Sequence, residues 1–279
     1  MIPKIIHYCW FGGNPLPELA VKCIESWKKF FPEYEIREWN ETNFDTCACD
    51  YVREAYEEKR WAFVSDYARF WILYHHGGIY FDTDVEVIKS MEEILNCGSF
   101  MGCELGYGCE ANPGLGMGAV PKLELYREIL EQYEKMHFRC KDGSYNEQTV
   151  VTHVSNILRK HGFQGSGEIE KMCGVTVYPP EYFCPMNYLD GQLIITDKTY
   201  SIHYYTGAWL SDIEKKVLKI GQKYSNKGFW GYLRKQMICL PLLMVDKTRK
   251  YGLINALKLA WKRIVTETKK AVKKRFGGR

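Results

Sequence analysis

The sequence has no apolar run long enough to cross a membrane. Its longest apolar segment extends from Met237 to Val245, 9 residues that already include Pro241, whereas a transmembrane helix needs about 20 apolar residues. The first residues, Met1 to Tyr8, also lack the basic start and apolar centre of a secretory signal peptide. From these absences we expect a cytoplasmic protein without a membrane-spanning helix.

Patterns typical of zinc sites and disulfide scaffolds are absent as well. The chain has 11 cysteines, an odd number. Cys47 and Cys49 are spaced too closely for a C-x₂-C zinc pair, and no second pair matches them. A disulfide scaffold is not expected in a chain of this length. We therefore interpret the cysteines as reduced residues, mostly in the core, which agrees with a cytoplasmic location.

Acidic residues are scarce at one end of the chain. Residues 225–279 contain 15 Lys and Arg but only 2 Asp and Glu, whereas residues 1–224 contain 23 basic and 32 acidic residues. We therefore expect an acidic body over 1–224 and a basic tail over 225–279. Such asymmetry indicates a polyanionic partner for the tail, either nucleic acid or an anionic membrane.

The tail combines its positive charge with apolar residues at helical spacing. In residues 229–245 and 251–276, aromatic residues such as Trp230 and Trp261 alternate with Lys and Arg. An amphipathic helix of this kind lies in the plane of an anionic membrane, so we predict peripheral attachment to the inner face of a membrane. The alternative is a solvated helix packed on the body. No motif that reads bases accompanies the charge, so nucleic acid is not expected as a partner.

The body begins with the pattern of an α/β sheet. Residues 2–10 are almost entirely apolar, residues 16–31 have helical spacing, and residues 34–39 alternate. They predict a strand, a helix and a second strand. Residues 50–76 predict one or two buried helices that end at a Gly-Gly pair. Later patterns predict a strand at 79–81, continued at 85–88, a glycine-rich loop over 100–117, helices over 121–137 and 146–161 (N-cap Asn146), strands at 175–178, 193–195 and 200–204, and mainly helix after 208.

Two acidic residues follow the strand expected at 79–81. Asp82 and Asp84 are two positions apart, so they point to one side of an extended chain. They lie beyond the carboxyl end of the strand, where open α/β sheets bind ligands. Two such carboxylates repel each other unless a cation neutralises them, and Mg²⁺ or Mn²⁺ suits oxygen ligands. The alternative is a solvated turn, because an isolated D-x-D triplet is common.

Asp66 and Arg69 lie on one face of the apolar helix that precedes the strand. Unpaired charges in such a helix would be costly. The planar fork of Arg69 suits phosphate or sugar hydroxyls. A helix with paired charges, a Gly-Gly stop, a strand and two acids is far more specific than the D-x-D triplet alone.

This arrangement resembles the sugar-binding D-x-D region of glycosyltransferase family 32. That family includes yeast initiation mannosyltransferases and bacterial capsule and lipopolysaccharide transferases, and its core recurs in clostridial glucosylating toxins. The resemblance is carried by residues 65–69, 73–84 and the opening segment 2–13. It implies a GT-A fold, a nucleotide-sugar donor and bound Mn²⁺ or Mg²⁺.

The resemblance also implies roles for individual residues. Trp10 matches the position expected to stack on the nucleobase, although it could equally be a core residue. Asp66 and Arg69 match contacts to the donor sugar and phosphate. Asp82 matches a residue that touches ribose and sugar and could share the metal, and Asp84 matches the direct metal ligand.

Later segments carry four further candidates. The segment from His203 to Trp209 is similar to the family's closing segment. It implies that His203 binds the metal and that Trp209 covers the diphosphate, but Ala208 stands where the family usually has serine. On the residues alone, His203 could instead be a core histidine. Glu147 and Gln148 are candidates for the polar group that faces the reacting sugar carbon in related transferases.

The sequence therefore predicts a metal-dependent glycosyltransferase of surface polysaccharide synthesis. It would move a hexose from a UDP- or GDP-sugar to a glycan or lipid-linked glycan, and the resemblance implies retention of configuration. A metal-dependent hydrolase of nucleotide-diphosphate sugars is one alternative, although no clustered ligands for a second metal are evident. A nucleotide-sugar-binding protein without turnover is another, although all four charged candidates of the D-x-D region are present.

Overall fold

The computed structural model describes residues 1–279 except 106–107, 189–190, 208–211, 225–226, 254–255 and 258–279. The chain divides into two compact units, one of residues 1–187 and 192–209, the other of residues 188–191 and 210–279. The helix before the basic tail thus belongs to the second unit, whereas charge alone placed the boundary after residue 224.

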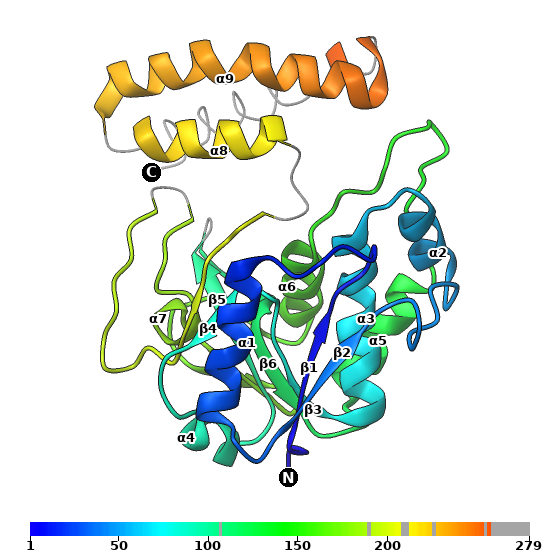
Figure 1. Cartoon of the computed structure of the whole chain (residues 1–279), viewed down its shortest axis with the longest axis vertical. Helices are drawn as coiled ribbons and strands as arrows, with labels where there is room; N and C mark the ends of the chain where they lie inside the picture. Colours follow the sequence, from blue (N-terminus) through cyan, green and yellow to red (C-terminus); the bar gives the residue numbers. More distant parts are fainter. Residues whose placement is uncertain (106–107, 189–190, 208–211, 225–226, 254–255, 258–279) are drawn as a thin grey trace. The chain divides into compact units, whose positions relative to one another are not determined.

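The first unit is built on a seven-stranded mixed sheet in the order β2-β1-β3-β6-β5-β8-β7 (Figure 1). β1 pairs in parallel with β2 and β3, and β5 pairs in parallel with β8. β6 runs antiparallel to β3 and β5, as β7 does to β8. The strands are β1 (Ile5–Cys9), β2 (Glu35–Trp39), β3 (Gly78–Tyr80), β5 (Phe100–Leu105), β6 (Cys109–Ala119), β7 (Glu170–Met172) and β8 (Val175–Tyr178). The predicted α/β fold is confirmed, and its sheet is mixed.

The predicted opening of strand, helix and strand is confirmed as β1, α1 (Glu18–Phe30) and β2. α1 begins after Pro17, which suits the residue before a helix, and ends just before Phe31 and Pro32. Its buried residues lie at helical spacing and form one stripe against the sheet: Ala20, Cys23, Ile24 and Trp27.

Most of the glycine-rich segment 100–117 forms the paired strands β5 and β6 of a hairpin, not the predicted loop. In the β5–β6 register Phe100 lies opposite Gly118. A Cβ on Gly118 would lie 2.4 Å from the Phe100 ring, and a Cβ on Gly102 would lie 2.9 Å from Phe183. The glycines therefore allow large rings to pack closely on the strands, and their number does not indicate a flexible segment.

Each face of the sheet has its own core because successive strand residues point to opposite sides. Tyr80 packs in one core, and its neighbours Ile79 and Phe81 pack in the other. Figure 1 shows α1 and α4 on one side of the sheet and α2, α3 and α5 on the other. The helices of the Tyr80 side are α2 (Asp50–Glu57), α3 (Trp61–His76), α5 (Glu124–Tyr133) and α6 (Val150–Lys160); those of the other side are α1, α4 (Glu92–Asn96) and α7 (Pro180–Phe183).

The end of the 79–88 segment and the start of α6 differ from the sequence predictions. β4 (Val85–Val87) does not continue β3 but forms a separate two-stranded antiparallel sheet with β9 (Ser201–His203). α6 is capped by Thr149, whose hydroxyl accepts the Thr152 N–H at 3.3 Å. Asn146 is not the cap.

The backbone of Asn146 has a partner that the sequence pattern does not reveal. The Asn146 backbone N–H donates to the Phe138 carbonyl at 2.7 Å, which holds this residue away from the helix. The strand predicted at 193–195 is also wrong, because Leu193 forms only an isolated bridge with Met186.

The second unit contains two packed helices, α8 (Asp212–Tyr224) and α9 (Gly228–Tyr251). Lys247 of α9 lies 3.8 Å from Glu214 of α8, and the Cys239 thiol contacts the Val217 carbonyl at 4.0 Å. The helical character predicted after residue 208 is confirmed over these ranges. Among the residues the structure describes, no helix has the length and apolar character needed to cross a membrane.

Candidate functional site

The turn from α3 to β3 sets the position of the acidic residues. Gly77 and Gly78 both have positive φ angles, 64° and 98°. A Cβ on Gly78 would lie 2.6 Å from the Ile5 carbonyl oxygen of β1. Only glycine therefore allows β3 to enter the sheet directly after the helix. As a result, the buried face of α3 lies beside the residues that follow β3.

Arg69 of α3 connects Asp66 and Asp82. Its Nη2 atom lies 3.0 Å from Asp66 Oδ1 and 3.4 Å from Asp82 Oδ1, and its Nε donates to the Ser65 carbonyl at 3.0 Å. The guanidinium also lies 5.0 Å from the ring centroid of Tyr80, and the Tyr80 hydroxyl donates to Asp82 Oδ1 at 3.1 Å. The three charged residues predicted from this segment thus form one connected group.

Burial determines how this group is charged. Burial raises the pKa of Asp66 to about 7, against the opposing effect of Arg69. Burial would lower the pKa of Arg69, but Asp82, Tyr80 and Asp66 together raise it above its usual range. The Asp82 side chain is 30% exposed, against 10% for Asp66 and 4% for Arg69. Asp82 is therefore the member of the group that a ligand can reach.

Asp84 belongs to a second group, which the β4–β9 sheet assembles. Val85 pairs directly with His203 in that sheet, and His203 Nε2 lies 3.1 Å from Asp84 Oδ1. The other carboxylate oxygen of Asp84 accepts the backbone N–H of Thr206 at 2.9 Å and its hydroxyl at 2.8 Å. Asp84 and His203, far apart in sequence, are therefore in direct contact.

The partners of Asp84 favour the charged form of its carboxylate. Burial would raise the pKa of Asp84, but His203 and Thr206 lower it well below its usual range. Burial would likewise lower the pKa of His203, but the adjacent Asp84 raises it. The carboxylate is thus ionised, and its charge favours a cation beside it.

Asp84 and His203 fit a divalent cation in donor type and spacing. Neighbouring ligands of an octahedral ion with bonds of about 2.1 Å are separated by about 3 Å, which is close to the 3.1 Å between these two atoms. Among the described residues, the buried Nδ1 atom of His203 has no hydrogen-bond partner. A neutral imidazole with its proton on Nδ1 leaves Nε2 as a metal donor. A nitrogen donor suits Mn²⁺ better than Mg²⁺.

Asp82 is held by a different partner from Asp84. Within the described part of the chain, no three His, Cys, Asp or Glu side chains are arranged to hold a metal, and Asp82 instead contacts Arg69 and Tyr80. A cation at Asp84 and His203 would therefore take further oxygen ligands from water or substrate phosphates.

Gly114 of β6 holds Asp82 by a backbone hydrogen bond and a close contact, which the sequence patterns did not reveal. The backbone N–H of Asp82 donates to the Gly114 carbonyl at 3.2 Å, and a Cβ on Gly114 would lie 2.2 Å from Asp82 Oδ2. Asn112 Oδ1 accepts the Gly114 N–H at 2.8 Å. Glu104 and Tyr205 join the same network. The sequence analysis could have placed Glu104, Asn112 and Gly114 beside the D-x-D segment only by predicting a β-hairpin in this region.

The remaining predicted residues lie in other settings. Glu147 Oε1 lies 3.4 Å from Arg60 Nη2, and Gln148 directly precedes the N-cap of α6; neither takes part in the Arg69 or Asp84 contacts above. Trp10 follows β1, is partly buried, and donates from Nε1 to the Asn14 carbonyl at 2.6 Å. Trp209 and Ala208 lie outside the described residues.

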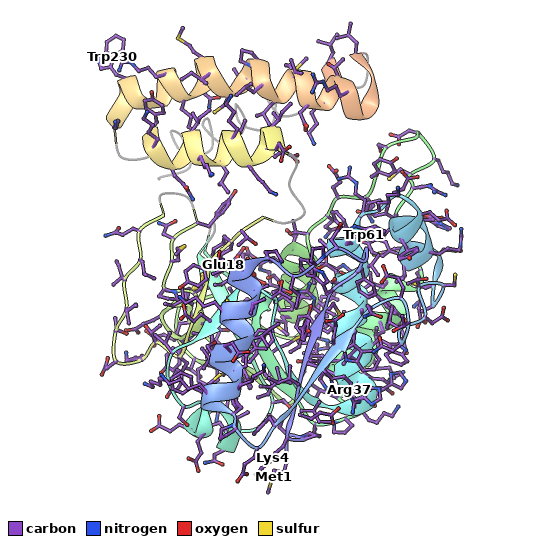
Figure 2. The ribbon with its side chains drawn as sticks, in the orientation of Figure 1. Met1, Lys4, Glu18, Arg37, Trp61 and Trp230 are labelled. Carbon is purple, nitrogen blue, oxygen red and sulfur yellow. The ribbon has the colours of Figure 1, made fainter. Side chains whose placement is uncertain are left out.

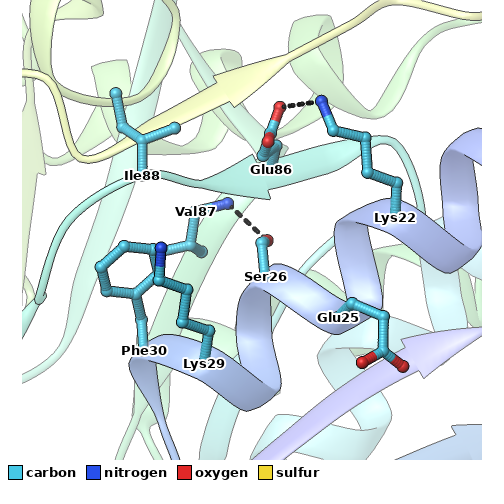
Figure 3. Close-up of a pocket in the computed structure, with 8 residues that line it drawn as sticks. All are labelled: Lys22, Glu25, Ser26, Lys29, Phe30, Glu86, Val87 and Ile88. Atoms are coloured by element: carbon cyan, nitrogen blue, oxygen red, sulfur yellow. Dashed lines mark hydrogen bonds and ion pairs between the residues drawn. The ribbon is translucent and has the colours of Figure 1, made fainter.

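A surface hollow of about 370 Å³ lies elsewhere, where α1 faces β4 (Figure 3). Lys22 and Glu86 form an ion pair of 3.0 Å along it, and the Ser26 hydroxyl accepts the Val87 N–H at 2.9 Å. None of the residues of the Arg69 or Asp84 groups lines this hollow.

Comparison with known families supports the importance of the D-x-D segment. Residues 17–100 match the family model of the glycosyltransferase sugar-binding region containing a DXD motif. The resemblance predicted from the sequence is confirmed over this sugar-binding region. It includes Asp66, Arg69, Asp82 and Asp84, whereas Glu147 and His203 lie beyond it.

Curated relatives of the sugar-binding region include two yeast proteins. The chain is 33% identical over 103 residues to inositol phosphoceramide mannosyltransferase 3 of Schizosaccharomyces pombe, a match that covers 34% of this chain and 28% of the relative. It is 27% identical over 146 residues to mannosyl phosphorylinositol ceramide synthase CSH1 of Saccharomyces cerevisiae, with 48% of this chain and 37% of the relative covered. The chain thus spans about a third of the length of these relatives.

Among solved structures, the PaToxG glycosyltransferase aligns with a TM-score of 0.44 at 15% identity. The alignment covers 57% of this chain and 69% of that one.

Proposed function

We propose that this protein is a metal-dependent glycosyltransferase with a GT-A fold that transfers a hexose from a nucleotide sugar. The observation that carries the proposal is the placement of Asp82 and Asp84 beyond β3. One is held by the buried Arg69, and the other by His203 and Thr206. The match of residues 17–100 to a glycosyltransferase sugar-binding region supports it.

The reaction is displacement at the anomeric carbon with a nucleoside diphosphate as leaving group. A divalent cation at Asp84 and His203, with Mn²⁺ favoured by the imidazole, would supply charge stabilisation to the departing diphosphate. Arg69 remains cationic and holds Asp82, and Asp82 is exposed enough to accept hydroxyls of the ribose or sugar. We propose that Asp66 orients Arg69 and that configuration is retained, with Gln148 or Glu147 facing the reacting carbon.

The names of the relatives indicate which sugar and which acceptor to test first. Both yeast relatives are named for mannose, and one is named for action on inositol phosphoceramide, a lipid. We therefore propose mannose as the first hexose to test, from a GDP- or UDP-linked donor with Trp10 against the base. A lipid-linked glycan in surface polysaccharide synthesis is the proposed acceptor.

A lipid acceptor places the site of action at a membrane. We propose that the basic tail, residues 225–279, attaches the protein peripherally to the inner, cytoplasmic face of an anionic membrane. The described part of the tail supports this: Trp230 and Met237 of α9 are each 75% exposed, and Figure 2 shows Trp230 projecting from α9 on the side away from α8. Exposed aromatic and apolar side chains of this kind are typical anchors at membrane interfaces.

A donor panel with a matched pair of variants tests the proposal. UDP- and GDP-hexoses would be incubated with the full-length protein, with Mn²⁺ or chelator, and nucleotide release measured with and without a lipid-linked acceptor pool. We expect Mn²⁺-dependent release that the acceptor accelerates. Asp84→Asn should reduce release at least about a hundredfold, whereas Asp50→Asn, which removes only a surface ion pair with Arg53, should not.

The other outcomes identify the alternatives. Release that no acceptor accelerates would favour a hydrolase, and donor binding without release would favour a binding protein. Equal release by Asp84→Asn, or full release in excess chelator, would overturn metal dependence.

A further inference from the structure

We propose that Glu104 is a positioning residue that holds both acids of the D-x-D segment in place. Only the kinetic experiment described below rests on the proposed function. Its basis is a hydrogen-bond network that starts from one carboxylate oxygen on β5. Glu104 Oε2 accepts the Asn112 side-chain amide at 2.7 Å and the Tyr205 hydroxyl at 2.9 Å. These two partners lead to Asp82 and to Asp84, respectively.

The Asn112 branch leads to Asp82. With its amide nitrogen held by Glu104, the buried Asn112 turns its oxygen to the Gly114 N–H, 2.8 Å away. Gly114 in turn accepts the Asp82 N–H at 3.2 Å and leaves no room for a Cβ beside the Asp82 carboxylate. Loss of the Glu104 contact would free the Asn112 amide to rotate. The Gly114 backbone that contacts Asp82 would then lose its hydrogen bond to Asn112.

The Tyr205 branch leads to Asp84. Tyr205 lies in the chain between His203 and Thr206, which both contact the Asp84 carboxylate, and has a positive φ of 49°. Such a conformation costs energy in a non-glycine residue and persists only when its surroundings hold it. The hydroxyl is held by Glu104 and by the Cys184 thiol at 2.9 Å, and the ring packs edge-on against His203 with centroids 4.2 Å apart.

The chemistry distinguishes positioning from a charge effect. Because a single oxygen of Glu104 receives both hydrogen bonds, an amide oxygen can replace it without loss of either bond. Glu104→Gln should therefore keep the network, whereas Glu104→Leu, of similar size, should break both branches. A role that needs the negative charge, such as proton transfer or metal ligation, would be lost in both variants.

Glu110 provides a matched control. It lies directly opposite Glu104 in the β5–β6 register and pairs with Arg159 at 2.6 Å, outside the network. Glu110→Leu thus removes a glutamate from the same rung of the same hairpin.

Amide hydrogen exchange followed residue by residue tests the positioning role without any substrate. The reporters are the Gly114 and Thr206 amides, bonded to Asn112 Oδ1 and Asp84 Oδ2, with buried α3 amides as the measure of global stability. In Glu104→Leu we expect both reporters to exchange at least tenfold faster relative to α3. In Glu104→Gln and Glu110→Leu we expect less than a threefold change.

The kinetic arm uses the nucleotide sugar that the wild-type protein turns over. We expect kcat in Glu104→Leu to fall at least tenfold and Glu104→Gln to restore it to within threefold of wild type. Unchanged reporters in Glu104→Leu, or faster exchange spread evenly over α3 as well, would overturn the proposal, as would equal loss of kcat in both variants. If no donor is turned over, the proposed function fails while the exchange result still decides the role of Glu104.

Discussion

His203 Nε2 lies 3.1 Å from Asp84 Oδ1, and this contact depends on a small sheet that is separate from the main one. β4 turns away from β3 after the D-x-D segment and pairs with β9, which ends in His203. The two acids of the segment therefore have different partners, since Asp82 stays with Arg69. A site with two separately held acids can dedicate one to the cation and the other to the sugar.

The fork of Arg69 should matter beyond its charge. Arg69→Lys keeps a cation, but one ammonium cannot reproduce the contacts with Asp66, Asp82 and the Ser65 carbonyl. We expect nucleotide release to fall about tenfold to a hundredfold. Arg127→Lys is the control, because Arg127 bridges Glu124 and Glu131 on the surface. Steady-state kinetics of both variants would measure this, and wild-type rates in Arg69→Lys would reduce Arg69 to a structural residue.

A methyl group at position 114 should displace Asp82. In Gly114→Ala the new Cβ would meet Asp82 Oδ2 at 2.2 Å, so either the carboxylate or β6 must move. We expect a destabilisation of about 1–3 kcal/mol and at least a tenfold weaker binding of the nucleotide sugar. Gly221→Ala, whose Cβ would make an ordinary contact of 3.6 Å with Lys235 Cε, should do neither. Titration calorimetry and thermal melting measure both effects. Donor binding of wild-type strength in Gly114→Ala would contradict the role of Gly114 in positioning Asp82.

The raised pKa of Asp66 should appear in the pH dependence of stability. In the folded protein burial raises the pKa of Asp66 to about 7 from the 3.8 of a free side chain. The folded state therefore holds this proton where the unfolded state has released it. The stabilising contribution is complete below about pH 4 and is lost as the pH rises through 7.

Asp66→Asn should remove this contribution. We expect the fall in Tm between pH 5 and pH 7 to be smaller in the variant than in the wild type, measured by differential scanning fluorimetry in a buffer series. Glu124→Gln, at an exposed position in the first turn of α5, should leave the slope unchanged. An identical slope in Asp66→Asn and wild type would show that Asp66 does not bind the proton.

The charge of the tail should govern attachment to membranes. Replacement of Lys269, Lys270, Lys273 and Lys274 by glutamine removes four positive charges, each worth about 1 kcal/mol near an anionic surface. We expect this variant to lose sedimentation with phosphatidylserine-containing liposomes at low salt and to retain nucleotide-sugar binding.

The control removes four exposed lysines from the body, Lys28, Lys29, Lys59 and Lys141, with the same net change in charge. It should sediment like the wild type. If the wild-type protein stays in solution with anionic liposomes, or if both variants lose binding equally, the tail is not a specific membrane anchor.

Several features of the site could be predicted from local sequence because they depend on short-range geometry. Asp66 and Arg69 are one helical turn apart, and the Gly-Gly pair ends the helix and starts the strand. Asp66 and Arg69 therefore share one helix face, as predicted, and the structure adds a contact between Arg69 and Asp82.

Pairing between distant segments could not be predicted in the same way. The glycines of residues 100–117 favour a loop when they are judged alone, but β5 and β6 pair as a hairpin in which Gly102 makes room for the Phe183 ring. That hairpin brings Glu104 and Asn112 to the site, and the β4–β9 sheet brings His203 to Asp84. The sequence by itself determined that Asp66 and Arg69 share a helix face and that Asp82 and Asp84 follow the next strand, because these residues lie within one helix–turn–strand unit. Only the tertiary structure decided the partners of Asp84 and the contact between Asp82 and Gly114. Strand pairing joins residues that are far apart along the chain, and such pairs leave no local sequence pattern.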